Sequence, residues 1–230
     1  MGRKLQAIIR RAGGILGIAL AAAAVPTAAG GAEDPEAGDL RDIRVGTEVE
    51  ALPSEGYTSF RCGAGGGDPG REIAGWAAFQ TCPPNPDGLH EVAFGYDEDA
   101  NPWAAVSDRF EGTTVAGHPV VPTLLIDDAG VVRGLRIVTD PGDRMYLKKK
   151  AYLLYVRVMG RYGRDGWSCE EREPEAGYRP VGGMYIDRRC EKRWKDRDLI
   201  LETQLFRAPG EEGRAFTGAT QLEIMQAPSG

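Results

Sequence analysis

The stretch VVPTLLIDDAGVVRGLRIVTD, residues 120–140, gives the clearest structural signal in the chain. Two runs rich in β-branched residues flank the tetrapeptide Asp127-Asp128-Ala129-Gly130. Acidic residues followed by a Gly in a left-handed position are typical of the turn between two antiparallel strands. The stretch therefore predicts a β-hairpin, around which the rest of the fold can be placed.

Four elements are predicted before this hairpin from the spacing of apolar residues and from β-branched and aromatic composition. They are a short edge strand at 46–53, a strand at 57–62, a short helix at 71–82 and a half-buried strand at 90–97.

The longest helix is predicted after the hairpin, over residues 143–163. Helical spacing gives it one apolar stripe and one basic stripe. The apolar stripe contains Ala151, Leu154, Tyr155, Val158 and Tyr162, and the basic stripe contains Lys150, Arg157, Arg161 and Arg164. Four further strands are predicted at 167–171, 182–194, 198–207 and 220–225, of which the middle two form a second hairpin.

Many strands and two main helices favour an α+β fold of antiparallel β-sheets over a parallel α/β fold. The chain divides into an acidic first half, 46–140, and a basic second half, 141–226. Each half has a helix, antiparallel strands and two cysteines, so two tandem helix-plus-sheet halves are an open alternative. This pattern is similar in outline to secreted β-lactamase inhibitor proteins, although no motif is shared and no functional residue carries over.

The N-terminal residues 1–32 predict a secretory signal peptide. Basic residues precede the apolar run GILGIALAAAAV, and small residues follow it, which places cleavage near Ala29–Ala32. The run is shorter than the ~20 apolar residues that cross a bilayer. Residues 33–45 predict a disordered acidic leader. We therefore expect a periplasmic or secreted protein with no transmembrane segment in the mature chain.

The chain has four cysteines, Cys62, Cys82, Cys169 and Cys190. An even number in an exported chain favours disulfide bonds, and the wide spacing does not fit a zinc-binding knuckle. Of the three possible pairings we predict Cys62–Cys82 and Cys169–Cys190, which give one bond in each half. Each bond closes a loop of some 20 residues, worth about 3 kcal/mol of stability.

Charge is unevenly distributed along the chain. The net charge of −6 becomes −10 without the four basic residues of 1–32. Residues 33–140 contain 7 basic and 20 acidic residues, a net of −13, whereas residues 141–207 contain 16 basic and 11 acidic residues, a net of +5. A basic half can bind an envelope protein or a polyanionic envelope component. It can also be a solvated surface, or help two oppositely charged halves to dock.

The stretch YDEDANPWAAVSD, residues 96–108, is the candidate metal site. Positions one, three, five and twelve of a calcium loop are occupied by Asp97, Asp99, Asn101 and Asp108. An EF-hand requires Gly at position six and a bidentate Glu at position twelve, and both are missing here. The hypothesis is a calcium- or lanthanide-binding turn, and the alternative is a polar β-turn without metal. No other cofactor is indicated.

Signatures of common enzymes are weak. The stretch GGGDPG, 65–70, matches G-x-G-x-x-G, but Asp68 would repel a pyrophosphate and Pro69 has no amide N–H. His90 and His118 are the only histidines, and neither lies near a nucleophile elbow. Paired carboxylates of a glycan hydrolase stay open as an alternative. The candidates for such a pair are Glu91, Asp97, Asp99, Asp127 and Asp128.

The stretch IDRRCEKRWKDR, 186–197, predicts a partner-facing surface. A Trp among cations can stack on a sugar or a base. The residues assigned to this surface are Arg188, Arg189, Lys192 and Trp194. As a strand, however, the stretch would place alternate residues on opposite faces, and its charges would also discourage strand-to-strand aggregation.

These features favour a non-enzymatic, disulfide-bonded binding or inhibitory module of the cell envelope or exterior. The alternatives are an envelope glycan hydrolase with paired carboxylates, and a calcium- or lanthanide-responsive exported protein. A concave pocket holding two acids at glycosidase separation would favour the hydrolase.

Overall fold

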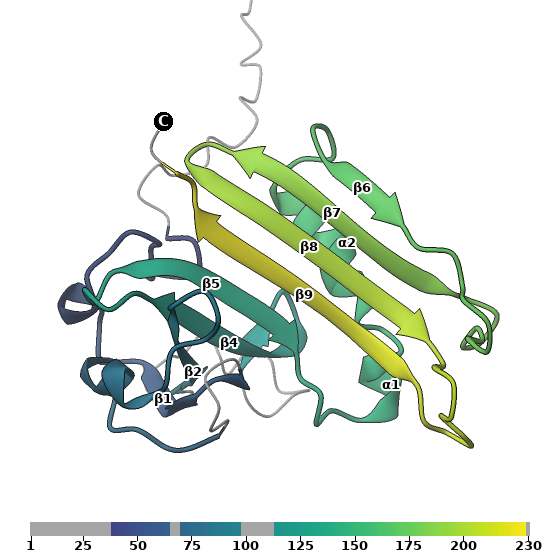
Figure 1. Cartoon of the computed structure of the whole chain (residues 1–230), viewed down its shortest axis with the longest axis horizontal. Coiled ribbons are helices and arrows are strands. Elements are labelled where there is room, and N and C mark those ends of the chain that lie inside the picture. Colours follow the sequence, from purple (N-terminus) through teal and green to yellow (C-terminus); the bar gives the residue numbers. More distant parts are fainter. Residues whose placement is uncertain (1–37, 65–69, 98–112, 229–230) are drawn as a thin grey trace, which may run out of the picture. The chain divides into compact units, whose positions relative to one another are not determined.

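The computed structural model describes residues 38–64, 70–97 and 113–228, which belong to one compact unit, Glu36–Gly230. The regular elements are mainly antiparallel strands, with few helices (Figure 1). The strands are β1 (Tyr57–Cys62), β2 (His90–Tyr96), β3 (Thr114–Val115), β4 (His118–Ile126), β5 (Val132–Thr139), β6 (Ser168–Glu171), β7 (Ile186–Trp194), β8 (Arg197–Phe206) and β9 (Thr217–Gln226). The helices are η1 (Val49–Ala51), η3 (Trp76–Thr81), α1 (Met145–Lys148) and α2 (Tyr152–Arg161).

These strands form one sheet in the order β1-β2-β4-β5-β9-β8-β7-β6, and β3 pairs with β4. Strand β9 connects the two parts of the sheet, because it pairs with β5 on one side and with β8 on the other. The α+β prediction therefore holds for an antiparallel sheet with few helices. Two tandem helix-plus-sheet halves are not shown, since one sheet contains the strands of both halves.

The hairpin predicted from 120–140 is confirmed as β4 and β5, with Leu124 opposite Leu135. Its turn is fixed by Asp127, whose carboxylate accepts a hydrogen bond from the backbone N–H of Val131 at 2.9 Å. Gly130 has a φ of +82°, a left-handed conformation in which Gly has no steric penalty. Asp127 and Gly130 thus form the turn in the way that the sequence predicts.

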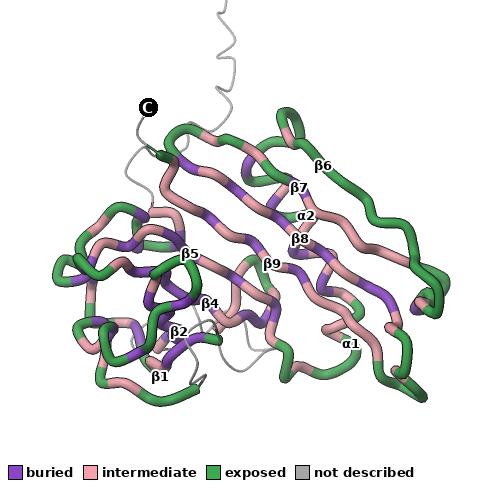
Figure 2. The backbone as a smooth tube through the Cα atoms, viewed as in Figure 1, coloured by how far each residue is buried: buried purple, intermediate pink, exposed green. Residues whose placement is uncertain are grey.

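The core lies between the sheet and α2, which packs against β8 and β9. Buried and partly exposed side chains alternate along β8, so that Leu199, Leu201 and Leu205 face the core (Figure 2). Most of the predicted apolar stripe of the helix is buried on the other side of this core, namely Ala151, Leu154, Val158 and Tyr162. The same core continues to β1 and β2, where the rings of Tyr57, Trp76 and Phe94 pack edge to face.

Two predictions near the N-terminus are wrong in detail. The segment 46–53 is not an edge strand but contains the 3₁₀ helix η1. The helix predicted over 71–82 is reduced to the 3₁₀ helix η3. Gly75, at a φ of +146°, precedes η3. Pro83 and Pro84 follow it, and they lack the N–H that a longer helix would need.

The helix predicted over 143–163 is divided into α1 and α2. At the break, the N–H groups of Lys150 and Ala151 bond to carbonyls three residues earlier, as in a 3₁₀ turn. Strand β9 comes very close to this turn, because a Cβ added to Gly218 would lie 2.6 Å from the carbonyl oxygen of Lys148. Among the described residues, no helix is long and apolar enough to span a bilayer.

The structure contains two disulfide bonds, which are the predicted pairs. The bond Cys62–Cys82 connects β1 to the residue after η3. The bond Cys169–Cys190 connects β6 to β7 at directly opposite positions of the ladder. The first bond therefore attaches the end of η3 to β1, and the second attaches the short strand β6 to the longer strand β7.

Candidate functional site

The candidate metal residues are only partly described. Asp97 follows β2, and its backbone N–H donates to the carbonyl of Gly56 at 3.0 Å. Asp99, Asn101 and Asp108 lie outside the described residues. Within the ranges that are described, no three His, Cys, Asp or Glu side chains are grouped as metal ligands would be. The calcium hypothesis therefore stays a prediction.

The residues predicted as a partner surface lie on two faces of β7. Arg188, Lys192 and Trp194 alternate onto the face covered by α2, and Arg189 points to the opposite face. Lys192 donates from Nζ to the carbonyls of Gly163 and Asp165, at 3.3 and 2.8 Å, and to that of Tyr162. This is a charged cap for the C-terminal end of α2.

The other three residues of this set also have partners inside the chain. Trp194 packs edge to face on the ring of Tyr162, with 5.0 Å between centroids. Arg188 contacts Tyr155 and Glu171. Arg189 is paired with Glu191 and Glu202. The four residues therefore lie on two faces of β7, and two of them, Lys192 and Trp194, contact the C-terminal end of α2. The partner surface stays a prediction.

Three of the acids considered for glycan hydrolysis, Glu91, Asp127 and Asp128, lie in an ion pair or in the β4–β5 turn, whereas Asp99 lies outside the described residues. Glu91 is only 2% exposed, and its Oε1 lies 2.9 Å from Nη1 of Arg136. The same guanidinium binds Glu223 through Nε at 2.8 Å. Burial lowers the pKa of Arg136, but hydrogen bonds to Glu223 and Glu91 raise it more, so the guanidinium stays charged. Glu91 is therefore a buried ion-pair partner.

Asp127 and Asp128 belong to the turn between β4 and β5. Asp127 binds Arg133 with 2.6 Å between Oδ2 and Nε. Asp128 lies 2.9 Å from Nε2 of His90, whose Nδ1 is 2.6 Å from the carbonyl oxygen of Cys82. His90 thus connects the hairpin turn to the first disulfide bond, and this arrangement has no nucleophile.

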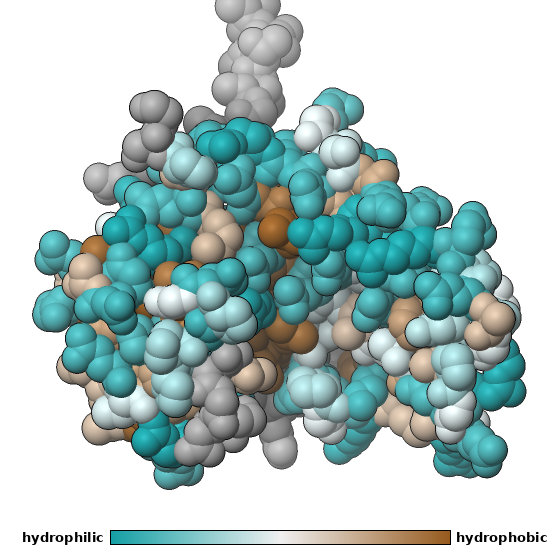
Figure 3. Space-filling model, in the orientation of Figure 1, coloured by the Kyte–Doolittle hydropathy of each residue, from teal (hydrophilic) through white to brown (hydrophobic). Residues whose placement is uncertain are grey.

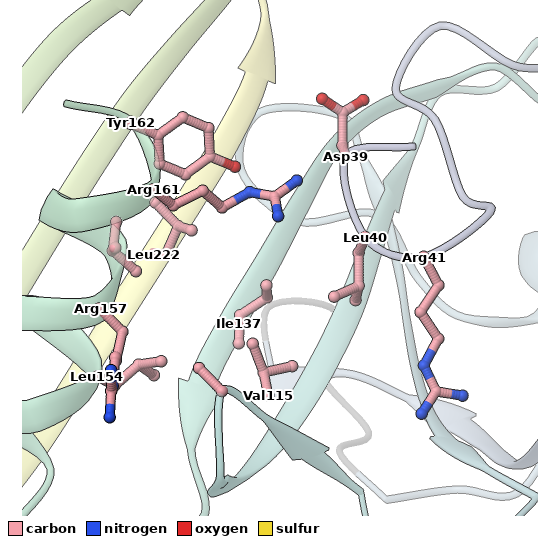
Figure 4. Close-up of a pocket in the computed structure, with 12 residues that line it drawn as sticks. Asp39, Leu40, Arg41, Val115, Ile137, Leu154, Arg157, Arg161, Tyr162 and Leu222 are labelled. Atoms are coloured by element: carbon pink, nitrogen blue, oxygen red, sulfur yellow. The ribbon is translucent and has the colours of Figure 1, made fainter. Parts of the chain in front are cut away.

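A pocket of about 390 Å³ lies between the segment 39–41, β3, β5, α2 and β9 (Figure 4). Its wall is mostly apolar, which makes it suited to a hydrocarbon or aromatic group. The apolar side chains that line it are Leu40, Val115, Ala116, Ile137, Leu154, Val158 and Leu222, together with the ring of Tyr162.

Three arginines, Arg41, Arg157 and Arg161, also line this pocket. The guanidinium carbon of Arg41 lies over the ring of Tyr96, 3.3 Å from its centroid. Arg157 and Arg161 are exposed, and within residues 38–64, 70–97 and 113–228 neither side chain makes a hydrogen bond or an ion pair. The guanidinium carbon of Arg161 lies 5.6 Å from the centroid of the Tyr162 ring. Figure 4 shows Arg161 extending from α2 toward the segment that carries Asp39.

The one carboxylate among the described lining residues is already neutralised. Asp39 binds Arg197, with 3.2 Å between Oδ1 and Nε, and each side chain is 8% exposed. Its Oδ2 also accepts from the backbone N–H of Val45 at 2.7 Å. Asp39 therefore does not cancel the positive charge of the arginines at the pocket.

The charge at the pocket also affects His118 in β4. Burial lowers the pKa of His118 below its usual value, and the positive charge of Arg157 lowers it further. The imidazole is thus neutral at pH 7. Tyr96 is neutral as well, since burial raises its pKa to about 12; Arg41 opposes this rise and Asp42 adds to it. Arginine is consequently the dominant charge here.

The sequence predicts no pocket, although two of the lining residues belong to a predicted stripe. The basic stripe of the predicted helix includes Arg157 and Arg161, but the opposite wall is residues 39–41, within the predicted disordered leader 33–45. In the structure the described part of that leader is packed, with Leu40, Ile43 and Val45 buried. The spacing of these three apolar residues was the available signal.

The geometry can hold an apolar group and place an anionic group beside one of two exposed guanidinium ions, which point to different ends of the α2 wall (Figure 4). Among the described lining residues there is no Ser, Thr, Cys or His that would act as nucleophile or base. No protein-family model matches the chain, and no curated protein or solved structure is significantly similar to it.

Proposed function

We propose that this chain is an exported, disulfide-bonded binding protein whose pocket takes a small amphipathic anion. The ligand would have an apolar tail and a carboxylate or similar oxyanion head. The observation that carries the proposal is the joining of an apolar wall to Arg157 and Arg161, two exposed arginines without an ion-pair partner among the described residues.

The size and lining of the pocket support the apolar tail. A volume of about 390 Å³ is within the range of small-molecule sites, roughly 300–1,000 Å³. Burying apolar ligand surface gains about 25 cal/mol for each Å² removed from water. The walls come from β3, β5, α2 and β9, so the sheet and the helix position them without a ligand.

The arginines support the anionic head. Arg157 and Arg161 are four residues apart in α2, so they lie on the same face one turn apart. A guanidinium group binds an oxyanion through two parallel N–H donors. Figure 4 shows the two guanidinium groups pointing to different ends of the α2 wall, so a carboxylate would bind at one of them and form an ion pair that the described residues do not provide.

Export is supported by the two disulfide bonds, because such bonds persist in oxidising compartments. The predicted signal peptide, 1–32, agrees with a periplasmic or secreted protein. A binding role without catalysis also agrees with the lining, which presents apolar and cationic groups.

Calorimetric titration with three ligands of equal tail length tests the proposal: decanoate, decanol and decyltrimethylammonium. We expect decanoate to bind, decanol to bind at least about tenfold more weakly for loss of the charge-assisted hydrogen bonds, and the cation not to bind. Val115→Trp, which fills the pocket from its partly exposed β3 wall, should abolish binding.

Charge-reversal variants test where the anionic head group of the ligand binds. Arg157→Glu/Arg161→Glu should lose decanoate binding, whereas Arg164→Glu, an exposed arginine just beyond α2 that does not line the pocket, should keep it. Equal affinity for decanoate and decanol, unchanged by the double variant, would exclude an anion site. Binding of none of the ligands by a correctly folded protein would exclude the pocket as a site for this class.

A further inference from the structure

Large exposed apolar side chains cluster at the end of the fold that carries α1. The described residues contain four such side chains, and three of them are Met145 (40% exposed), Tyr146 (64%) and Met184 (43%). Met145 and Tyr146 belong to α1. Met184 is connected to Val181 by two backbone hydrogen bonds, and Val181 lines a hollow together with Met145.

This hollow has a volume of about 270 Å³ and lies between α1, the loop around Val181 and the connection from β8 to β9. Figure 1 shows α1 beside the start of β9, next to that connection. Three cations, Lys149, Arg207 and Arg214, line the hollow with Phe216. Apolar and cationic groups are thus mixed in one small area.

The cations are arranged by contacts within the chain. Arg207 donates from Nε to the carbonyl of Ala215 at 2.9 Å and from Nη2 to that of Gly213 at 3.2 Å. Lys149 Nζ lies 6.0 Å from the centroid of the Phe216 ring. Neither contact neutralises a positive charge, because carbonyls and rings carry no net charge.

Acidic side chains are also present near the hollow. Glu211 and Glu212 lie in the β8–β9 connection, and Glu211 accepts a hydrogen bond from the backbone N–H of Ala208 at 2.6 Å. On the side of α1, however, Lys148, Lys149 and Lys150 form an unbroken basic run. The basic run and the exposed apolar residues of α1 are adjacent in sequence and in space.

We infer that this area docks on the surface of an anionic phospholipid bilayer. We call it the α1 surface and define it by Met145, Tyr146, Lys148, Lys149, Met184 and Phe216. Basic side chains attract an anionic headgroup layer, and apolar side chains beside them enter its outer part. Exposed Tyr is also common at the level of headgroups. This inference goes beyond the proposed pocket function and rests on different residues.

The exposed apolar residues favour a bilayer over a soluble polyanion. A polyanion offers phosphates or sulfates to lysine and arginine, but it has no apolar layer for Met145, Tyr146 and Met184. Tyr146 also has the ammonium group of Lys150 over its ring, 4.1 Å from the centroid. In this arrangement the ammonium group of Lys150 can stay at the level of the headgroups, while its methylene stem and the Tyr146 ring contact the apolar part of the bilayer surface.

Co-sedimentation with vesicles tests the inference. The purified protein, disulfides intact and its mass measured, is mixed with vesicles of phosphatidylcholine alone or with a quarter of phosphatidylglycerol. We expect binding to the anionic vesicles only. Lys148→Glu/Lys149→Glu should weaken it by at least about 25-fold, since each lysine contributes about fivefold.

Two more double variants complete the test. Met145→Ser/Tyr146→Ser should weaken binding on the order of tenfold, through lost apolar contact. Arg164→Glu/Lys195→Glu, which makes the same charge change at the opposite end of α2 and β7, should weaken it far less. Equal loss in both charge variants would overturn a specific docking surface, because net charge alone would then explain it.

The soluble polyanion is tested with dextran sulfate. If dextran sulfate binds as tightly as the vesicles, and Met145→Ser/Tyr146→Ser binds vesicles like the parent, the bilayer proposal is overturned. The Val115→Trp variant separates the two proposals. Loss of decanoate binding with unchanged vesicle binding shows that the α1 surface acts independently of the pocket.

Discussion

Asp39 and Arg197 are 158 residues apart in the chain, yet Oδ1 of one lies 3.2 Å from Nε of the other. The pair attaches the segment 39–41 to the start of β8. Arg197 also donates to the carbonyl of Val45 at 2.9 Å. Since residues 39–41 form one wall of the pocket, this buried ion pair positions the candidate site as well as the N-terminal segment.

Asp39→Asn should therefore destabilise the fold. Removing one partner of a buried ion pair costs about 3–5 kcal/mol, but Asp196 also lies 2.6 Å from Arg197, so we expect about 2 kcal/mol. Urea unfolding measures the change, and Asp196→Asn, at a side chain that is 78% exposed, is the matched control. Equal effects of the two variants would contradict the role of Asp39.

Each disulfide bond should contribute about 3 kcal/mol through the loop that it closes. The separations are 20 residues for Cys62–Cys82 and 21 for Cys169–Cys190. The paired variants Cys62→Ala/Cys82→Ala and Cys169→Ala/Cys190→Ala should each lower the free energy of unfolding by about this amount. A reductant should then lower the midpoint of the parent but not that of a variant with all four cysteines replaced.

His118 should report ligand binding at the pocket through its pKa. Burial and then the charge of Arg157 lower this pKa, so the folded state binds the proton less well than the unfolded state. The contribution of neutral His118 to the free energy of unfolding is fully present above about pH 6.5. It is lost as the pH falls through the pKa of His118 in the folded state. An anion bound at Arg157 would offset the Arg157 charge and raise the pKa of His118.

The imidazole signals measure this effect directly, because the chain has two histidines. An NMR titration should show the pKa of His118 rising on addition of decanoate and in Arg157→Gln. Decanoate affinity should increase as the pH falls through the His118 transition. If the pKa of His118 does not change at saturating decanoate, the anionic head group does not bind at Arg157.

Lys192→Met should release the C-terminal end of α2. The substitution keeps an apolar stem but removes the ammonium group that caps the carbonyls of Tyr162, Gly163 and Asp165. We expect a loss of about 1–2 kcal/mol, from hydrogen bonds to a charged group. Thermal unfolding and hydrogen exchange at residues 158–162 measure it. Lys195→Met, at an exposed turn position, should have little effect.

Local signals made part of this fold predictable. The β4–β5 hairpin follows from Asp127 and Gly130, which act within the turn itself. The disulfide pairs follow from the division of the cysteines between two halves. The buried side of α2 follows from the spacing of Leu154 and Val158. In each case the residues that determine the element are close together in sequence.

Other features depend on contacts that a single stretch of sequence does not contain. The pocket joins Leu40, Val115, Ile137, Leu154 and Leu222 from five separate segments. Strand alternation correctly separates Arg189 from Arg188, but it does not say which face of β7 a helix covers. The contacts of Lys192 and Trp194 with the end of α2 therefore appear only in the structure, and their place in a partner surface stays a prediction.

The place of β9 has a consequence for how such a chain matures. It follows every other described strand in sequence, yet it lies between β5 and β8 in the sheet. A polypeptide that has emerged only as far as residue 216 has two open sheet edges in place of one continuous ladder, and the α2 side of the core lacks Leu222 and Ile224. In a chain made from its N-terminus, the two parts of the sheet can therefore join only once residues 217–226 are available, although ladders such as β7–β8 need no residue of β9.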